Sequence, residues 1–445
     1  MRDYDNYNSR NTRETRDRRS LKRKQAMQRR RRISLIVGIL ILAGIVWGIV
    51  TIVEHTGDSG SSTHKIATSS TEKDKKGEEE IPEKPEPITL TINCIGDIMM
   101  HSPQTEAMYG DSGELEIETY FSYVKPLIEK ADLSLCNLES PMAGPPYLGY
   151  PLFSVPDEFA DEITGAGFDV IITANNHILD QGLDGMIKTA EVLKSKGIDF
   201  VGSRLNTADK DYLVLDIKGV KVGVIGYTYE TTGSPGNRTM NGSPMSEEAK
   251  SLMSSYIPGL ESDYEPIKKS IADAKQDGAE IVVAYFHWGE EYQREPNASQ
   301  REVAQMAADN GADIIFASHP HVIQPMEMLD SGGKKVPVYW SMGNYISNQR
   351  AETLDNKYTE QGIVAEVSLT YDPEKAAISH FEMSYIPLWV DKYHNGKRNI
   401  YAVIPLVDGF QDNPTLGASG NTYRAEGALA DIEGLVGSNL EWTSP

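Results

Sequence analysis

The chain has 445 residues, of which 39% are hydrophobic and 24% are charged. This composition excludes a wholly disordered protein and a membrane protein with many spans. Two cysteines are too few for a framework of several disulfides or a cysteine-based zinc cluster. The net charge of −22 is uneven, because the first 32 residues hold 11 Arg, 2 Lys and four acidic residues and the rest carries −31. Such an acidic body argues against nucleic acid as a partner, since nucleic-acid binding needs a basic face.

The first apolar segment has the length of a membrane-spanning helix. Ile33–Val53 is a run of 21 residues without a charge, and a helix of that length reaches about 30 Å, one hydrocarbon core. Arginines precede it, which predicts a basic cytoplasmic tail at residues 1–32 and an extracellular body at the cell membrane. A cleaved signal peptide is the alternative. It is disfavoured because its apolar core usually has about 7–15 residues and is followed by a small-residue cleavage site.

The next segment has the composition of a spacer. Residues 54–87 are mostly Gly, Ser, Thr, Lys, Glu and Pro and contain no aromatic residue, which predicts a disordered linker. The folded domain is predicted over residues 88–405. Residues 406–445 contain few large apolar side chains, so we expect a loosely packed C-terminal extension with one short helix at Ala425–Val436.

Short apolar runs alternate with helical patterns through the body. The runs lie within Ile88–Ile95, 133–136, 170–174, 281–286 and 314–318. Between them, apolar residues recur at helical spacing, as in Ile267, Ile271 and Ala274. Continuous apolar strands alternating with amphipathic helices indicate an α/β fold with a parallel sheet covered on both faces.

Each apolar run ends in a residue that can bind a metal or transfer a proton. In open α/β sheets, ligands bind outside the carboxyl ends of the strands, so we expect these side chains to converge. Imidazole, carboxylate and amide ligands suit one or two divalent ions such as Mn, Zn or Fe. The predicted metal ligands are Asp97, Glu139, Asn176, His287, His319 and His321.

Three further residues are candidates for catalysis. His177 directly follows Asn176 and is predicted to protonate a leaving group at the edge of the metal site. Asp180, three residues on, is predicted to orient His177. Glu291 follows His287 by four residues, as on the next turn of a helix, and is predicted to orient an imidazole or act as a base.

The ordered motifs resemble a known family. They are Gly-Asp97, Asn137-Leu-Glu139, Asn175-Asn-His177-x-x-Asp180, His287-Trp-Gly-x-Glu291-Tyr292, His319-Pro-His321 and Gly343-Asn344-Tyr345. Together they resemble the CapA-type capsule-synthesis family, linked to poly-γ-glutamate synthesis and export, over about residues 88–350. The resemblance implies a fold similar to calcineurin-like metallophosphoesterases, a four-layer sandwich of two sheets flanked by helices. It also implies an anionic surface polymer and membrane-bound synthase subunits as partners.

The sequence departs from the metallophosphoesterase pattern at two positions. Met99 stands where that pattern has a metal-binding His after Asp97, and Glu139 stands where it has a bridging Asp. His101 lies four residues after Asp97, and only a bent loop would bring it to the metal. The number of ions, one or two, therefore stays open.

The remaining segments carry weaker signals. Gly362–Tyr371 and Ala377–Leu388 alternate apolar and polar residues, which predicts a hairpin of a second, mostly antiparallel sheet. Thr231–Gly242 is rich in Gly and Pro and is either a lid over the site or a plain loop. Cys94 and Cys136 are expected side by side on neighbouring strands as buried thiols.

The expected function is therefore that of an anchored extracellular protein of capsule or anionic-polymer biosynthesis with a divalent-metal site. Whether it is an enzyme stays open, and if active it is expected to be a metal-dependent hydrolase of phosphoesterase type. The alternatives are a general cell-surface phosphoesterase and a non-catalytic assembly subunit with a vestigial site.

Overall fold

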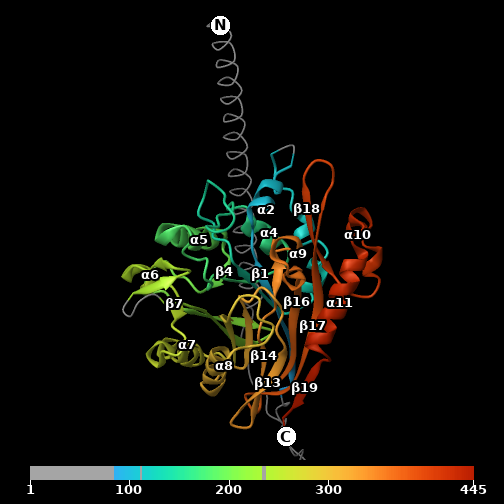
Figure 1. Ribbon diagram of the computed structural model, residues 1–445. Helices are drawn as coiled ribbons and strands as arrows, with labels where there is room; N and C mark the ends of the chain where they lie inside the picture. The colour runs from blue at the N-terminus through green and yellow to red at the C-terminus, as the bar shows by residue number, and fades with distance from the viewer. Residues whose placement is uncertain (1–84, 111–112, 233–236, 445) are drawn as a thin grey trace, which may run out of the picture. The chain divides into compact units, whose positions relative to one another are not determined.

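The computed structural model describes residues 85–110, 113–232 and 237–444 (Figure 1). The predicted basic tail, the membrane helix at 33–53 and nearly all of the predicted linker lie outside these residues. Among the helices of the described residues, none is long and apolar enough to cross a membrane.

The first sheet combines a parallel half with an antiparallel half. Its strand order is β18-β17-β16-β1-β2-β3-β4, with β15 beside β1 and β19 beside β17. The parallel strands are β1 (Ile88–Ile98), β2 (Leu133–Leu138), β3 (Val170–Ile172), β4 (Asp199–Val201) and β15 (Asn344–Ile346). The antiparallel strands are β16 (Gln361–Asp372), β17 (Ala377–His394), β18 (Asn399–Pro405) and β19 (Leu440–Thr443).

The predicted hairpin therefore exists as β16 and β17, but its place differs from the prediction. It extends the first sheet instead of starting a second one, because β16 pairs antiparallel with β1 from Ile88 opposite Tyr371 to Ile95 opposite Val364. The alternation of apolar and polar residues along the hairpin shows that one face of each strand is covered. It does not show which neighbouring strand each one pairs with.

The second sheet has the order β10-β6-β11-β12-β14-β13, with β5 beside β6. Its parallel strands are β6 (Val220–Tyr229), β10 (Ser255–Tyr256), β11 (Ile281–His287), β12 (Ile314–Ser318) and β14 (Lys334–Tyr339). Its antiparallel edge strands are β5 (Tyr212–Ile217) and β13 (Met326–Ser331). The five apolar runs are thus divided between the two sheets, three in the first and two in the second.

Two faces of the sheets pack on each other and helices cover the outer faces, so the expected four layers are present. The central core joins Ile92 and Leu135 of the first sheet to Val283 and Phe316 of the second. On the outer face of the first sheet lie α2 (Ser102–Ala107), α3 (Lys125–Ile128), α4 (Phe159–Gly165) and α5 (Gly182–Lys196). On the outer face of the second lie α7 (Tyr264–Gln276) and α8 (Ala298–Asp309) (Figure 1).

Shorter elements connect these layers. The predicted glycine-rich segment forms a small antiparallel sheet of β7 (Thr231–Thr232), β8 (Arg238–Met240) and β9 (Ser243–Pro244), followed by α6 (Glu247–Leu252). Arg238 of β8 binds the buried Glu230 through two contacts of 2.5 and 2.6 Å. The described part of this segment is therefore attached to the body by a charged pair.

The C-terminal residues correct the expectation of loose packing. They form α10 (Pro414–Ser419) and α11 (Thr422–Val436). The short helix α9 (Ala351–Leu354) lies earlier in the chain. The predicted helix is present and begins three residues before Ala425. Its buried side chains belong to the central core: Ala425, Ala428, Ile432 and Val436. These side chains are few and two of them are small, but they recur on one face of the helix. This short apolar stripe is enough to pack the helix on the body.

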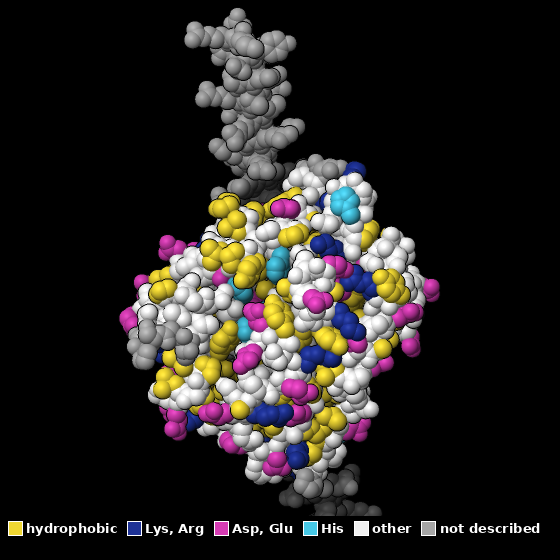
Figure 2. All heavy atoms as spheres, viewed as in Figure 1, with side chains coloured by type: hydrophobic (Ala, Val, Ile, Leu, Met, Phe, Trp, Pro, Cys, Tyr) yellow, Lys and Arg dark blue, Asp and Glu magenta, His cyan; other side chains and the backbone are white. Residues whose placement is uncertain are grey.

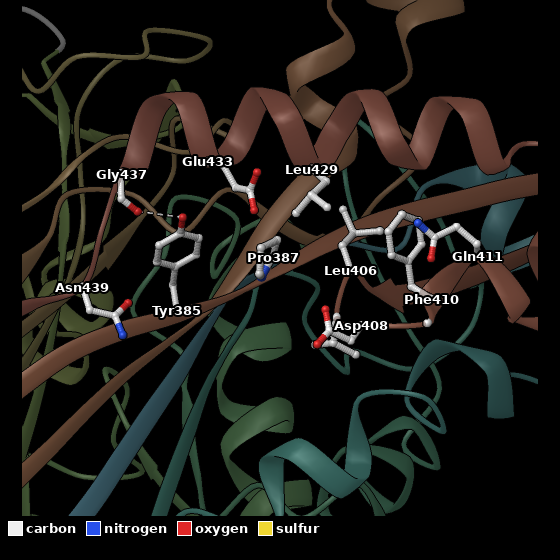
Figure 3. Close-up of a pocket in the computed structure, with 12 residues that line it drawn as sticks. Tyr385, Pro387, Leu406, Asp408, Phe410, Gln411, Leu429, Glu433, Gly437 and Asn439 are labelled. Atoms are coloured by element: carbon white, nitrogen blue, oxygen red, sulfur yellow. Dashed lines mark hydrogen bonds between the residues drawn. The ribbon is translucent and has the colours of Figure 1, made fainter.

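Figure 3 shows how α11 crosses β17. Leu429 and Glu433 of the helix face Pro387 and Leu406, and together with their neighbours they line a cavity of about 360 Å³. The Tyr385 hydroxyl on β17 donates a hydrogen bond of 2.9 Å to the carbonyl oxygen of Gly437. The helix is thus fixed at its end as well as along its apolar face.

Candidate metal centre

The carboxyl ends of strands from both sheets meet at one place. Asp97 lies near the end of β1, Glu139 directly follows β2, and Asn176 follows β3. From the second sheet, His287 ends β11 and His319 follows β12. The expected convergence is therefore present, with three predicted ligands contributed by each sheet once His321 is included.

Short distances join the six side chains. Nδ1 of His321 lies 3.0 Å from Oδ2 of Asp97, and Nε2 of His287 lies 2.9 Å from Oδ1 of Asn176. His287 Nε2 is also 3.3 Å from Oε1 of Glu139 and 3.2 Å from Nδ1 of His319. Two sets of donor atoms lie within 4.8 Å of one another: Glu139 with His319 and His321, and Asp97 with Glu139 and His287. Glu139 is common to both sets, as a bridging ligand would be.

The Glu139 carboxylate has the environment expected of a metal ligand. It is fully buried, and within the described part of the chain neither of its oxygens has a hydrogen-bond partner. Burial, followed by the charge of Asp97, raises the pKa of Glu139 well above its ordinary value. An unpaired buried carboxylate is costly unless a cation or a proton neutralises it. The donor set and this orphaned carboxylate fit one or two divalent ions.

Burial favours the neutral, metal-binding form of two site histidines, His287 and His319. Burial lowers the pKa of His287 to about 3, and burial followed by the charge of His287 lowers the pKa of His319 well below its ordinary value. Neutral imidazoles keep a lone pair for a metal ion. Both rings can therefore act as ligands at neutral pH.

Two asparagines position Asp97, and the sequence interpretation assigned them no role. The Asn137 side-chain amide donates to Oδ1 of Asp97 at 2.8 Å. Asn175 in turn donates to Oδ1 of Asn137 at 3.1 Å and to the carbonyl of Leu138 at 2.8 Å. Both belong to motifs quoted above, so the signal was present in the repeated Asn at the strand ends. Such outer contacts fix the direction of a metal ligand.

The loop after β12 has a strained backbone. His319 and His321 have φ angles of 105° and 58°, in the left-handed region that side chains other than glycine rarely adopt. The amide of Tyr292 donates to the carbonyl of Pro320, between the two histidines, at 2.7 Å. This contact holds the loop in a conformation that turns both imidazoles towards the carboxylates. Strained residues of this kind gather at functional sites.

His177 and Asp180 form a buried pair next to the ligands. Nδ1 of His177 lies 2.8 Å from Oδ2 of Asp180, which also accepts the backbone amide of Phe153 at 2.8 Å. The ring of Phe153 packs edge-on against the imidazole at 4.7 Å. The predicted contact between the two residues is therefore present, and their catalytic roles stay predictions.

Glu291 is not on a helical turn after His287. The strand β11 ends at His287, the chain turns, and the next helix, α8, begins only at Ala298. Glu291 is exposed, and among the described residues it makes no hydrogen bond to a site histidine. Burial, followed by the Glu291 charge, raises the pKa of Tyr229 and of Tyr292. The spacing of four was misleading because it does not lie within one helix.

His101 lies near the site but does not contact Asp97. It precedes the first residue of α2, and its Nδ1 accepts the backbone amide of Asn348 at 3.3 Å. Its ring packs edge-on against Phe153 at 5.2 Å, so Phe153 separates it from His177. Burial lowers the pKa of His101 to about 3. His101 therefore does not replace the missing histidine at Met99.

The comparison with known families matches this part of the chain. A model of the family described as bacterial capsule synthesis protein PGA_cap matches residues 91–349, which contain all six predicted ligands. The chain belongs to this family. The predicted resemblance to capsule-synthesis proteins is thereby confirmed.

Two curated relatives of this PGA_cap chain carry related descriptions. The capsule biosynthesis protein CapA of Bacillus anthracis is 29% identical over 276 residues, which cover 58% of this chain and 60% of that protein. The PGA biosynthesis protein CapA of Bacillus subtilis is 29% identical over 269 residues, 58% of this chain and 64% of that protein. The chain thus spans less than two thirds of the length of these relatives.

Solved structures show a more distant likeness. A phosphatase of Mycoplasma pneumoniae is 14% identical, with a TM-score of 0.40, over 68% of this chain and 95% of its own. A hypothetical protein of Thermus thermophilus is 11% identical, with a TM-score of 0.39, over 67% of this chain and 99% of its own.

Proposed function

We propose that this PGA_cap protein is anchored in the cell membrane by Ile33–Val53 and acts outside the cell in the assembly of an anionic surface polymer, poly-γ-glutamate or a similar chain. In this proposal it is a metal-dependent hydrolase that cleaves or transfers an ester of phosphoesterase type. Membership of a capsule-synthesis family supports the process, and the names of the two CapA relatives support the class of polymer. Membrane-bound synthase subunits are its proposed partners.

The observation that carries the proposal is the Glu139 carboxylate. Two unpartnered, fully buried oxygens stand among an aspartate and three histidines. A purely structural cluster would pair such oxygens with N–H or O–H donors. Ions held there by Asp97, Glu139, Asn176 and the three histidines would polarise a substrate oxygen and lower the pKa of bound water.

His177 would handle the proton of the leaving group. Asp180 holds Nδ1 of the ring, which leaves Nε2 as the atom that gives or takes a proton. The low exposure of both side chains, 4% each, keeps bulk water from competing for that contact. Asn137 and Asn175 keep Asp97 directed at the metal, so that ligand and acid hold their relative positions.

The acidic body bears on how a polyanion would be held. With −31 outside the first 32 residues, the chain repels a polyanion at long range. A bound divalent cation offers the polymer a local positive charge, which a basic groove would otherwise supply. The proposal therefore makes the metal centre the point of attachment for the charged group.

Metal analysis of the full-length protein in detergent tests the proposal. The wild type should contain one or two equivalents of Mn, Zn or Fe, and Glu139→Gln should lose most of it. His394→Ala, an exposed histidine at the end of β17, is the matched control and should keep it. Phosphodiester hydrolysis should follow metal content across the three proteins. A wild type that binds none of these metals would overturn the proposal.

One observation favours a non-catalytic assembly subunit as a second candidate. Met99 is buried where the phosphoesterase pattern has a histidine, and His101 is engaged with Asn348 and Phe153 instead. The set of donors is thereby one short of the full two-ion pattern. Tight metal binding without hydrolysis of any phosphoester or polyglutamate chain would favour this candidate.

A further inference from the structure

Aromatic rings surround the metal centre. We call them the aromatic collar: Tyr150, Phe153, Tyr229 and Tyr292. Tyr229 lies 4.7 Å from the ring of His319, and Tyr292 lies 6.4 Å from that of His321. Phe153 lies 4.7 Å from the ring of His177 and 6.5 Å from that of Tyr150. Figure 2 shows histidine side chains at the surface near the middle of the view, among hydrophobic and acidic side chains, with Lys and Arg side chains close by on the right.

Tyr150 is displayed by a firmly held loop. Its side chain is 68% exposed, and exposed Leu148 and Leu152 flank it. Leu148 and Ser154 exchange two backbone hydrogen bonds of 3.0 and 2.9 Å across the loop. The Gln181 side chain donates to the carbonyl of Leu152 at 3.0 Å. Large apolar side chains kept in water by so many contacts mark a binding surface.

Tyr292 itself has a strained backbone conformation. Its φ angle is 66°, and its amide is bonded to Pro320 in the loop that carries the two histidines. The side chain is 36% exposed, and its hydroxyl lies 3.5 Å from Nε2 of Gln349. A left-handed tyrosine is unfavourable, and its attachment to the ligand loop couples the ring's position to that of His319 and His321.

The four collar side chains carry no charge, and one acidic residue is their neighbour in the chain. Glu291 directly precedes Tyr292 in the chain, and it is exposed. The rings of the tyrosines can stack on the apolar C–H face of a sugar ring, and a neighbouring carboxylate can accept hydrogen bonds from the hydroxyl groups at its edge.

We propose that the aromatic collar binds an uncharged sugar ring next to the ester that the metal centre holds, so that the substrate is a sugar-containing phosphoester. This rests on the metal centre and the phosphoester chemistry of the proposed function, and it names a sugar phosphoester in place of poly-γ-glutamate as the substrate. The six ligand residues would hold the ions that bind the phosphoryl group, and Tyr150 and Tyr292 would contact the sugar. Hydroxyl groups of the sugar donate to the Glu291 carboxylate at the rim.

Two non-hydrolysable phosphonates test the inference in the full-length, metal-loaded protein. One is the analogue of glucose 1-phosphate and the other that of glycerol 1-phosphate, so the charged group is the same and only the first has a sugar ring. Calorimetric titration should show at least tenfold tighter binding of the glucose analogue. Tyr150→Ala and Tyr292→Ala should each remove most of this preference and leave the binding of the glycerol analogue unchanged.

Tyr423→Ala is the matched control, because Tyr423 is a tyrosine of similar exposure, 71%, that lies on α11. It should bind both analogues as the wild type does. Equal affinity of the wild type for both analogues would overturn the sugar inference and leave the proposed function standing. A poly-γ-glutamate oligomer that binds more tightly than either, unaffected by the tyrosine substitutions, would also overturn it. Binding of neither analogue would overturn both proposals.

Discussion

His287 and Asn176 meet across the two sheets, with Nε2 of the histidine 2.9 Å from the amide oxygen of the asparagine. One residue ends β11 of the second sheet, and the other follows β3 of the first. Both side chains are polar and fully or almost fully buried, so their burial alone does not stabilise the core. Under the proposed function both residues would hold the same ion, and this leads to the first prediction.

His287→Ala should lose metal and activity together. The imidazole belongs to one of the two donor sets, so its removal leaves that set with two carboxylates only. Metal content after dialysis should fall at least tenfold, and turnover of any cleaved substrate should fall with it. A variant that keeps its full metal content would show that His287 is not a ligand.

His177→Ala should keep its metal and lose turnover. The ring is bonded to Asp180 and is free to act as an acid at its other nitrogen. Loss of a general acid typically costs about 10²–10⁴-fold in rate. Parallel metal analysis and initial rates distinguish this from the result for His287→Ala. Unchanged rates on every substrate that the wild type cleaves would rule out the acid role.

The metal-free protein should lose stability as the pH falls below about 6.5. His101 has a folded-state pKa of about 3, against about 6.5 for an unfolded histidine. The unfolded state therefore binds a proton that the folded state does not, and stability present above pH 6.5 is lost as the pH falls towards 3.

His101→Phe should reduce this pH dependence by one proton, or about 1.4 kcal/mol per pH unit within that window. The measurement is urea unfolding in EDTA between pH 7.5 and 4.5, for wild type and variant. Phenylalanine suits the place because His101 already packs edge-on against Phe153. Identical slopes for the two proteins would show that His101 is protonated in the folded state.

Gly96→Ala should damage both the fold and the metal centre. A Cβ at this position would lie 1.8 Å from the carbonyl oxygen of Gly343, whose bond to the Asp97 amide is 3.0 Å long. Overpacking of this kind costs about 1–3 kcal/mol and would displace Asp97. Thermal unfolding and metal titration should both report a loss. Gly165→Ala in α4, where a Cβ meets nothing within 4 Å, should leave both unchanged.

The positions of the candidate metal ligands could be predicted from the sequence, because the signal for each one lies in a short segment of the chain. Each ligand follows an apolar run, and parallel strands bring their carboxyl ends to one edge. The apolar runs and the helical spacing of Ile267 and Ile271 likewise revealed the α/β class, because burial of both sheet faces leaves a continuous signal.

Register and pairing could not be predicted in the same way. Cys94 and Cys136 were expected side by side, but Cys94 pairs with Leu135 and Cys136 with Ile95. A shift of one residue sends the two thiols to opposite faces, Cys94 into the central core and Cys136 towards the outer helices. Nothing in either strand's own sequence specifies this offset, because both faces of both strands are apolar.

The aromatic collar escaped prediction for a different reason. Its members come from three separate segments, the loop of Tyr150 and Phe153, the end of β6 and the loop after β11, and exposed tyrosines are common in any sequence. Only the positive φ of Tyr292 and the packing of Phe153 between two histidines identify them as part of the site. Such features arise from tertiary contacts and leave no period in the sequence.

The division of ligands between the sheets has a mechanical consequence. Asp97, Glu139 and Asn176 move with one sheet, and the three histidines move with the other. An ion bound by both sets is a cross-link whose strength depends on the spacing of the two layers. A substitution in the interior between them, such as Val283→Ala, should therefore weaken metal affinity without touching a ligand, and metal loading should in turn slow hydrogen exchange at strands of both sheets.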